Sequence, residues 1–173
     1  MMKPKVLELM TEQVKNELES GYFYLSMAAY FHSQNFDGMA KWMRTQAHEE
    51  TVHGMKLFDH LVSRGETVKL QDLKPRKTSW SSVQEAWEDT HKHEQFVTGK
   101  IHDLLSAARE AKDYAVEVLI QWYVKEQVEE EATSSRVADL ARRVGDSKNG
   151  MIMLDHELGH RKGPEGSPFA PGA

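Results

Sequence analysis

The stretch of residues 66–80 reads "ETVKLQDLKPRKTSW" and determines which topology the chain can adopt. It contains Pro75 and has no apolar residues at helical spacing, so it predicts an extended connection rather than a helix. Fully extended, its roughly fifteen residues reach about 50 Å. A helix of roughly 28 residues is about 42 Å long. The stretch can therefore run the length of a long helix, and the helices before and after it can be parallel.

Four amphipathic segments flank this stretch, two before it and two after it. In each segment, residues of one face recur at alternating steps of three and four, which is the spacing of a helix stripe. The stripes run from Leu7 to Phe31, from Met39 to Leu61, from Val83 to Ala108 and from Val116 to Val144. The pattern predicts four helices of roughly thirty residues, longer than the average globular helix.

The other connections are short. Residues 34–38 join the first helix to the second, and residues 111–113 join the third to the fourth. Each of these pairs should therefore be antiparallel neighbours. Together with the long connection, they predict an all-α four-helix bundle with one long crossover between the second and third helices.

A short fifth helix is expected after Gly145, with Asp146 or Ser147 as its N-cap. Its apolar stripe consists of Met151, Leu154 and Leu158. We expect residues 1–162 to form a single domain, because 173 residues are one domain's worth of chain. Residues 163–173 are rich in Gly and Pro and are expected to form a flexible tail.

The composition argues against several classes of protein. A net charge of −5 argues against a nucleic-acid-binding surface as the main function. The absence of cysteine excludes disulfides, iron–sulfur clusters and thiol catalysis. No apolar run approaches the roughly 20 residues that span a bilayer, and residues 1–5 do not lead into a signal-peptide core. We therefore expect a cytoplasmic protein that binds neither nucleic acid nor membrane.

Each of the four predicted helices carries a carboxylate on its stripe. These residues are Glu17, Glu50, Glu94, and Glu126 with Glu130. Counted at about 1.5 Å per residue, they lie roughly 18 to 20 Å from one end of their helices, so they should meet near mid-height of the bundle. Buried together without a cation, the carboxylates would repel one another and each would lose its hydration. The pattern therefore predicts a cation among them.

His53 lies one turn after Glu50, so the expected donor set is rich in oxygen and has one imidazole. Such a set suits iron or manganese better than a thiolate-seeking metal, and bridging carboxylates fit a pair of metal ions. The alternative is a metal-free structural bundle whose stripe glutamates are protonated or hydrated.

The separations of these residues resemble those of a known family. The residues that carry the likeness are Glu17, Tyr24, Glu50-Thr51-Val52-His53, Glu94 and Glu126-Gln127-Val128-Glu129-Glu130. From residue 3 to about 161 the chain is similar to the non-haem ferritins of prokaryotes, which have a ferritin-like fold. The resemblance implies a ferroxidase that oxidises Fe(II) with dioxygen or hydrogen peroxide. It also implies storage and detoxification of iron as a ferric mineral inside a homo-oligomeric 24-mer cage.

The resemblance also implies a role for each matching residue. One iron would be held by Glu17, Glu50 and His53. Glu50 would bridge to a second iron, which would be held further by Glu94 and Glu130, with Gln127 beside it. A third iron position maps onto Glu49, Glu126, Glu129 and Glu130. Tyr24 would lie against the dinuclear site, although its position also fits an ordinary core aromatic.

Two related di-iron oxidases or peroxidases are alternatives. A bacterioferritin places a haem-ligating Met directly after the bridging Glu, where this chain has Thr51. It also carries a second E-x-x-H motif where this chain has Gln127 to Glu130, so no haem is expected. A rubrerythrin adds a cysteine-rich iron domain, and this chain has no cysteine.

A separate motif, His156-Glu157-Leu158-Gly159-His160, matches the H-E-x-x-H pattern of zinc proteases. The extended pattern requires a third His where this chain has Gly166, and no segment alternates as a strand that could align a peptide. We therefore do not expect a protease. If four such helices meet at a fourfold axis, as the resemblance implies, His156 and His160 would gather into a secondary metal site.

Overall fold

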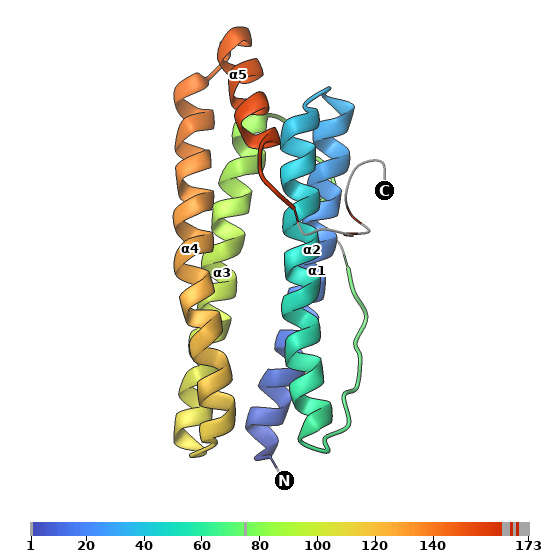
Figure 1. The fold of residues 1–173 in the computed structure, drawn as a ribbon, viewed down its shortest axis with the longest axis vertical. Coiled ribbons are helices and arrows are strands. Elements are labelled where there is room, and N and C mark those ends of the chain that lie inside the picture. Colours follow the sequence, from blue (N-terminus) through green and yellow to red (C-terminus); the bar gives the residue numbers. More distant parts are fainter. Residues whose placement is uncertain (1, 75, 164–166, 168, 170–173) are drawn as a thin grey trace.

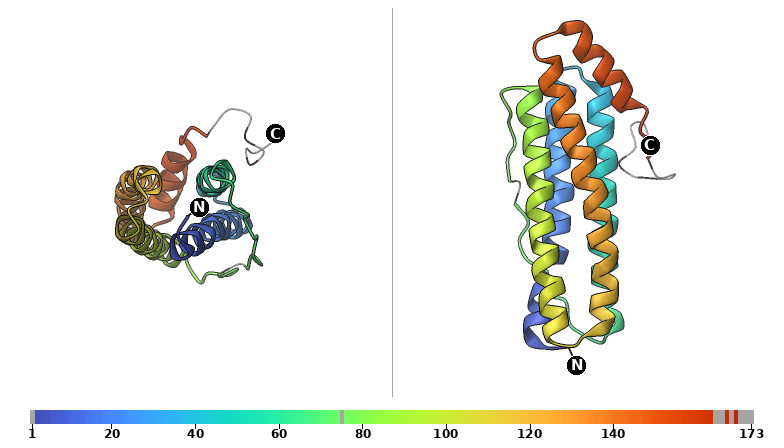
Figure 2. Two further views of the ribbon diagram at one scale, coloured as in Figure 1. Left: turned by 90° about the horizontal axis from the view of Figure 1, so that it is seen from below. Right: turned by 90° about the vertical axis from the view of Figure 1, so that its left-hand side faces the viewer.

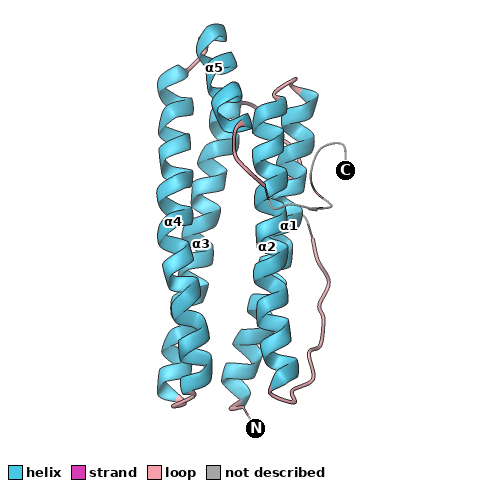
Figure 3. Ribbon diagram, in the orientation of Figure 1, coloured by secondary structure: helices cyan, strands magenta, loops and turns pink. Residues whose placement is uncertain are grey.

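The computed structural model describes residues 2–74, 76–163, 167 and 169. Within these residues the chain forms five α-helices and no strand (Figure 3). They are α1 (Pro4–Ser33), α2 (Asp37–Ser63), α3 (Val83–Glu110), α4 (Tyr114–Val144) and α5 (Lys148–Gly159). The predicted all-α bundle of four long helices with a short fifth helix is confirmed.

The long connection between α2 and α3, residues 64–82, runs along the outside of the bundle from one end to the other (Figures 1 and 2). It allows α2 and α3 to be parallel, as we predicted from the length of residues 66–80. Trp80 anchors its far end, because its ring lies 6.0 Å from that of Phe23 and 5.5 Å from that of Tyr30. Pro75 lies outside the described residues.

Local signals fix the ends of α4 and α5. Gly145 follows α4 with φ +52°, a backbone conformation that a residue with a Cβ rarely adopts, and the chain reverses there. The hydroxyl of Ser147 then accepts a hydrogen bond from the N–H of Gly150 at 3.2 Å. Of the two expected candidates, Ser147 is therefore the N-cap of α5.

Helix α5 folds back onto α2 and α4 at the upper end of the bundle (Figure 2). A Cβ at Gly38 would lie 1.9 Å from the carbonyl oxygen of Asp155, so only glycine lets α2 begin this close to α5. The Asp155 carboxylate accepts from the N–H of Met39 at 2.8 Å, and Lys41 donates to the carbonyl of Gly159 at 2.9 Å. These bonds fix the end of α5 against α2.

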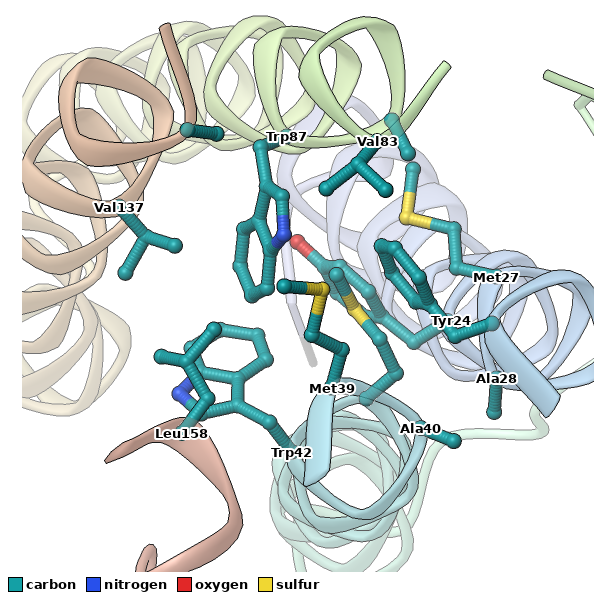
Figure 4. Packing of buried hydrophobic residues seen from close by; sticks show 14 of the residues in the cluster. Tyr24, Met27, Ala28, Met39, Ala40, Trp42, Val83, Trp87, Val137 and Leu158 are labelled. Carbon is teal, nitrogen blue, oxygen red and sulfur yellow. The ribbon is translucent and has the colours of Figure 1, made fainter. Parts of the chain in front are cut away.

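Two apolar clusters fill the bundle. The upper cluster includes Trp42, Trp87 and Leu158 (Figure 4), and the lower one includes Leu57 and Ile101. A layer of buried polar side chains lies between the two clusters. It contains Glu17, Glu50, His53, Glu94 and Gln127. The carboxylates of the predicted stripes on α1, α2 and α3 thus meet near mid-height, and on α4 the half-buried Glu130 borders this layer.

None of the described helices combines the length and the apolar character that crossing a bilayer requires. Of the expected tail, residues 163–173, only Gly163, Ser167 and Phe169 are described. The remainder of that prediction lies outside the described residues, and the division of the chain at residue 162 stays a prediction.

Candidate metal centre

Two glycines let α1 and α2 approach each other at the level of the buried carboxylates. Gly21 lies one turn after Glu17, and a Cβ there would stand 3.1 Å from the carbonyl oxygen of Ala47. Gly54 lies one turn after Glu50, and a Cβ there would stand 3.3 Å from the Cβ of Glu17. Because both contacts are already close, larger side chains would push the helices apart. The glycines therefore bring Glu17 and Glu50 together.

Glu17, Glu50 and His53 form the centre of the buried layer. Each offers one ligand atom, and these atoms all lie within 4.8 Å of one another. The exposed fractions of the three residues are 1%, 3% and 7%. His53 Nδ1 lies 3.6 Å from Glu50 Oε2. The structure thus gathers the three residues predicted to hold the first iron into an arrangement that one cation can share.

Two glutamines hold these carboxylates in place. Gln13 Nε2 donates to Glu17 Oε1 at 2.8 Å, and Gln46 Nε2 donates to Glu50 Oε1 at 2.9 Å. Such outer hydrogen bonds orient metal ligands. Neither glutamine could be predicted from the sequence, because a lone Gln on a helix is usually a solvated residue.

Glu94 of α3 completes the layer and is 2% exposed. The hydroxyl of Tyr24 donates to Glu94 Oε1, and Gln127 Nε2 donates to Glu94 Oε2 at 3.2 Å. The same amide nitrogen lies 3.3 Å from Thr98 Oγ1. Tyr24 is therefore a buried core aromatic that also hydrogen-bonds to the Glu94 carboxylate, and its place beside a dinuclear iron site stays a prediction.

The buried face of α4 differs from its predicted stripe. The prediction that Glu126 lies on the buried seam is wrong, because Glu126 is only half-buried whereas Gln127 is 5% exposed. The buried positions of the middle of α4 are Ile120, Tyr123, Gln127 and Ser134. An amide and a hydroxyl can satisfy their hydrogen bonds inside the bundle, whereas a carboxylate at the seam would lose its hydration.

A pocket of about 570 Å³ opens beside the layer, between α2 and α4 and below α5. We call it the outer pocket. Among the described residues, α2 and α4 make no close backbone contact, which leaves room for it. Its acidic lining residues include Glu49, Glu126, Glu129 and Glu130, and His53 also lines it. The four residues predicted for the third iron therefore all line one pocket, which reaches the edge of the buried layer at His53. Iron binding by these four residues stays a prediction.

The acids of the layer carry strongly shifted pKa values. Burial raises the pKa of Glu17 and of Glu94 well above the ordinary value, and the charge of Glu50 raises both further. Burial likewise raises the pKa of Glu130 to about 7. Without a metal ion, carboxyl groups of the layer therefore keep their protons, and these protons reduce the negative charge that would otherwise be buried.

Glu50 and His53 shift the other way. Burial opposes the charge on Glu50, but the hydrogen bond and the charge of His53 outweigh it, so the pKa of Glu50 lies below its ordinary value. Burial also lowers the pKa of His53, but the Glu50 carboxylate outweighs this and leaves the pKa raised. Without a metal ion, this pair is an anion facing a cation, and a metal ion bound by His53 would take the place of the imidazolium proton, because a ligating imidazole is neutral.

The histidine next to Glu94 belongs to the protein core. His93 Nε2 lies 2.8 Å from Ser20 Oγ, and its ring centre lies 4.9 Å from that of Phe23. Burial and the nearby charge of Arg76 lower the pKa of His93 to about 4. His93 is thus a neutral core residue and not part of the donor set.

Of the histidines of the protease-like motif, His156 lies on α5 and His160 is its C-cap residue, and their ring centres are 4.5 Å apart. His160 Nδ1 lies 2.7 Å from the carbonyl oxygen of His156 and hydrogen-bonds to it. Glu157, which would be the base of a protease, forms an ion pair with Arg136 at 3.3 Å. Metal binding by these histidines at a symmetry axis stays a prediction.

Comparison with known proteins shows a likeness over most of the chain. A family model for the ferritin-like domain matches residues 7–144. The chain is 36% identical over 158 residues to a bacterial non-heme ferritin of Escherichia coli O157:H7, covering 91% of this chain and 96% of that one. It is 35% identical over 161 residues to one of Staphylococcus epidermidis, covering 93% and 97%. An open pore ferritin from the hyperthermophilic archaeon Archaeoglobus fulgidus has a similar structure, with a TM-score of 0.92, 40% identity, and coverage of 94% and 100%.

Proposed function

The chain belongs to the ferritin family, and we propose that it is a ferroxidase that stores and detoxifies iron. Iron is its substrate and its cargo: it oxidises Fe(II) at a dinuclear centre and holds the ferric product as a mineral inside a protein cage. The observation that carries this proposal is the buried layer of Glu17, Glu50, His53 and Glu94 between two apolar clusters. Bound cations stabilise such a layer more than protons do, because they leave the buried carboxylates ionised and paired with positive charge.

We assign two iron positions within the layer. The first lies among Glu17, Glu50 and His53, whose ligand atoms share one small volume. The second lies among Glu50, Glu94 and Glu130. In support of it, the charges of Glu50 and Glu130 both act on Glu94, and Gln127 contacts the Glu94 carboxylate. The charge of Glu50 also raises the pKa of Glu17. Glu50 is therefore close to residues of both positions and suited to bridge the two ions.

The reaction balances for either oxidant. Two Fe(II) supply two electrons, which with two protons reduce one dioxygen to hydrogen peroxide or one hydrogen peroxide to two water molecules. The protein contributes position and charge. Glu17 and Glu94 give up their protons as Fe(II) binds, because the ions favour the ionised carboxylates. The bonds from Tyr24 and Gln127 keep Glu94 oriented while this happens.

A third iron position lies in the outer pocket, at Glu49, Glu126, Glu129 and Glu130. Support comes from the pocket lining, to which all four carboxylates and His53 belong. Glu130 belongs both to this pocket and to the second position of the layer. The pocket thus offers a route between the buried centre and solvent.

Rapid mixing tests the ferroxidase function. Protein loaded with Fe(II) without oxygen is mixed with oxygenated buffer, and the ultraviolet absorbance of Fe(III) is recorded. We expect a fast phase whose amplitude saturates at two Fe(II) per chain, because two positions lie within the buried layer. Prior loading with Zn²⁺ should remove the fast phase. Oxidation no faster than in buffer without protein would contradict the proposal.

We further propose a cytoplasmic 24-mer cage. Large apolar side chains stay exposed on a single chain, which suits burial against further copies. They include Tyr114, Val118, Val128, Ile152 and Met153. Sedimentation velocity at micromolar concentration should give a particle with the mass of twenty-four chains. A monomer or dimer under these conditions would exclude the cage.

A further inference from the structure

Arg161 follows α5 and places its guanidinium in the outer pocket. One of its nitrogens donates to the Glu49 carboxylate, and another donates to Gln46 Oε1 at 2.8 Å. The guanidinium carbon lies 4.2 Å from the centre of the Trp42 ring. A planar cation is therefore held by its two-pronged hydrogen bonding and by stacking, a combination that lysine does not offer.

The position of Arg161 is set by the fold. Lys41 binds the carbonyl oxygen of Gly159, two residues earlier in the chain. A Cβ at Gly159 would lie 3.1 Å from the Cα of Gly38, so the chain passes α2 at close range just before Arg161. The side chain of Arg161 is only 21% exposed. The guanidinium is therefore part of the pocket wall.

Arg161 also connects the outer pocket to the buried layer through Gln46. The amide oxygen of Gln46 accepts from Arg161, while its amide nitrogen donates to Glu50 Oε1 at 2.9 Å. Turning the amide over would break both bonds, because a guanidinium cannot accept and a carboxylate cannot donate. Arg161 thereby fixes the atom of Gln46 that faces Glu50.

Arg136 provides an internal comparison. It also lines the outer pocket, but its guanidinium pairs with Glu157 at 3.3 Å, and its side chain is 58% exposed. Of the two arginines in the pocket lining, Arg161 is thus the one that contacts a carboxylate assigned to the third iron position. The two residues have the same charge and differ in what they touch.

We propose that Arg161 is a built-in cation that competes with metal ions for Glu49 and positions Gln46 toward Glu50. The proposal rests on the proposed function, because it takes the outer pocket to be the third metal position. A metal ion that binds Glu49 must displace the guanidinium, so the outer pocket binds more weakly than the layer and fills after it. Displacement also releases Gln46, so an ion in the outer pocket loosens the hold on Glu50.

Titration with Zn²⁺ tests the proposal without any oxidation step. Isothermal calorimetry on the assembled, metal-free protein should show two tight sites per chain and a weaker third. Arg161→Gln should tighten the third site about fivefold to tenfold, because no charge-assisted pair has to be broken. The Zn²⁺ affinity of the two tight sites should fall by no more than about threefold, because Arg161 affects Glu50 only through Gln46.

Three further variants make the test specific. Arg161→Lys keeps the charge but loses the two-pronged contact. The Zn²⁺ affinity of its third site should therefore lie between the affinities of the wild type and Arg161→Gln. Arg136→Gln, the matched control, should change the affinity of the third site by less than about twofold, because the Arg136 charge is exposed and paired with Glu157. Glu49→Gln should abolish the gain of Arg161→Gln. A fold that is merely disturbed would weaken all three sites, so tightening of one site is a distinct readout.

Two results would overturn the role of Arg161. One is a third-site affinity that is equal in the wild type and in Arg161→Gln. The other is an equal gain in Arg136→Gln, which would show that only net charge matters. Absence of the tight pair in the wild type would instead count against the proposed ferroxidase centre, and the comparison of the two arginines would still decide what Arg161 does.

Discussion

Replacing Glu50 with alanine is expected to slow the fast phase of Fe(II) oxidation by at least about a hundredfold. Glu50 shares one small volume with Glu17 and His53, and its charge also acts on Glu94. Its loss therefore removes a ligand from both proposed iron positions. It also removes the bond that Gln46 donates to Glu50. Stopped-flow absorbance at two Fe(II) per chain measures the effect.

Two companion variants separate chemistry from folding. Glu50→Gln keeps the volume of the side chain but loses its charge, so it should be slowed nearly as much as Glu50→Ala. Asp59→Ala removes an exposed acid from the same helix and should keep the rate within about twofold. If Glu50→Ala assembles normally and oxidises Fe(II) at the wild-type rate, the assignment of the centre fails.

The metal-free protein is expected to lose stability as the pH rises from about 6.5 to about 8.5. A group whose pKa is raised by folding contributes stability below its unfolded pKa and loses it as pH rises through its folded pKa. The raised pKa values of Glu17 and Glu94, that of Glu130 at about 7, and that of His53 all act in this direction. Each proton released on unfolding changes the stability by about 1.4 kcal/mol per pH unit.

His93 sets the lower limit of this pH window. Its folded pKa of about 4 lies below the unfolded value of about 6.5, so its contribution is present above pH 6.5 and is lost as pH falls. Above about pH 6.5 the pH dependence of stability therefore reports on the buried layer and no longer on His93. Guanidinium chloride unfolding of chelator-treated protein gives the free energy at each pH.

The double variant Glu17→Gln/Glu94→Gln is the matched control for this pH dependence. It should flatten the dependence, because two of the buried groups no longer titrate. Saturation with Zn²⁺ should flatten it as well, because the bound ions hold the carboxylates ionised. A metal-free wild type whose stability stays constant or rises over this window would contradict the electrostatic account of the layer.

Much of the architecture follows from local patterns. The spacing of apolar residues predicts the four long helices, and the length of residues 66–80 predicts that α2 and α3 are parallel. Helical rise alone then brings Glu17, Glu50 and Glu94 to one level. These predictions succeed because each depends only on regular helix geometry and on contour length.

The parts that the sequence did not predict depend on packing between elements. On α4, Glu126 lies three residues after Tyr123 and Gln127 lies four residues after it, and both steps keep a residue on the same helix face. The pattern therefore could not distinguish Glu126 from Gln127. The partners of the carboxylates, Gln13 and Gln46, have no motif. Arg161 reaches the outer pocket only because of the angle at which α5 returns, and no local pattern encodes that angle.

Anomalous X-ray scattering from crystals soaked in Fe(II) without oxygen tests the central claim most directly. We predict two strong iron peaks per chain in the buried layer, one among Glu17, Glu50 and His53 and one among Glu50, Glu94 and Glu130. A weaker third peak should lie in the outer pocket. Iron found only in the outer pocket or on α5, with none in the buried layer, would contradict the account.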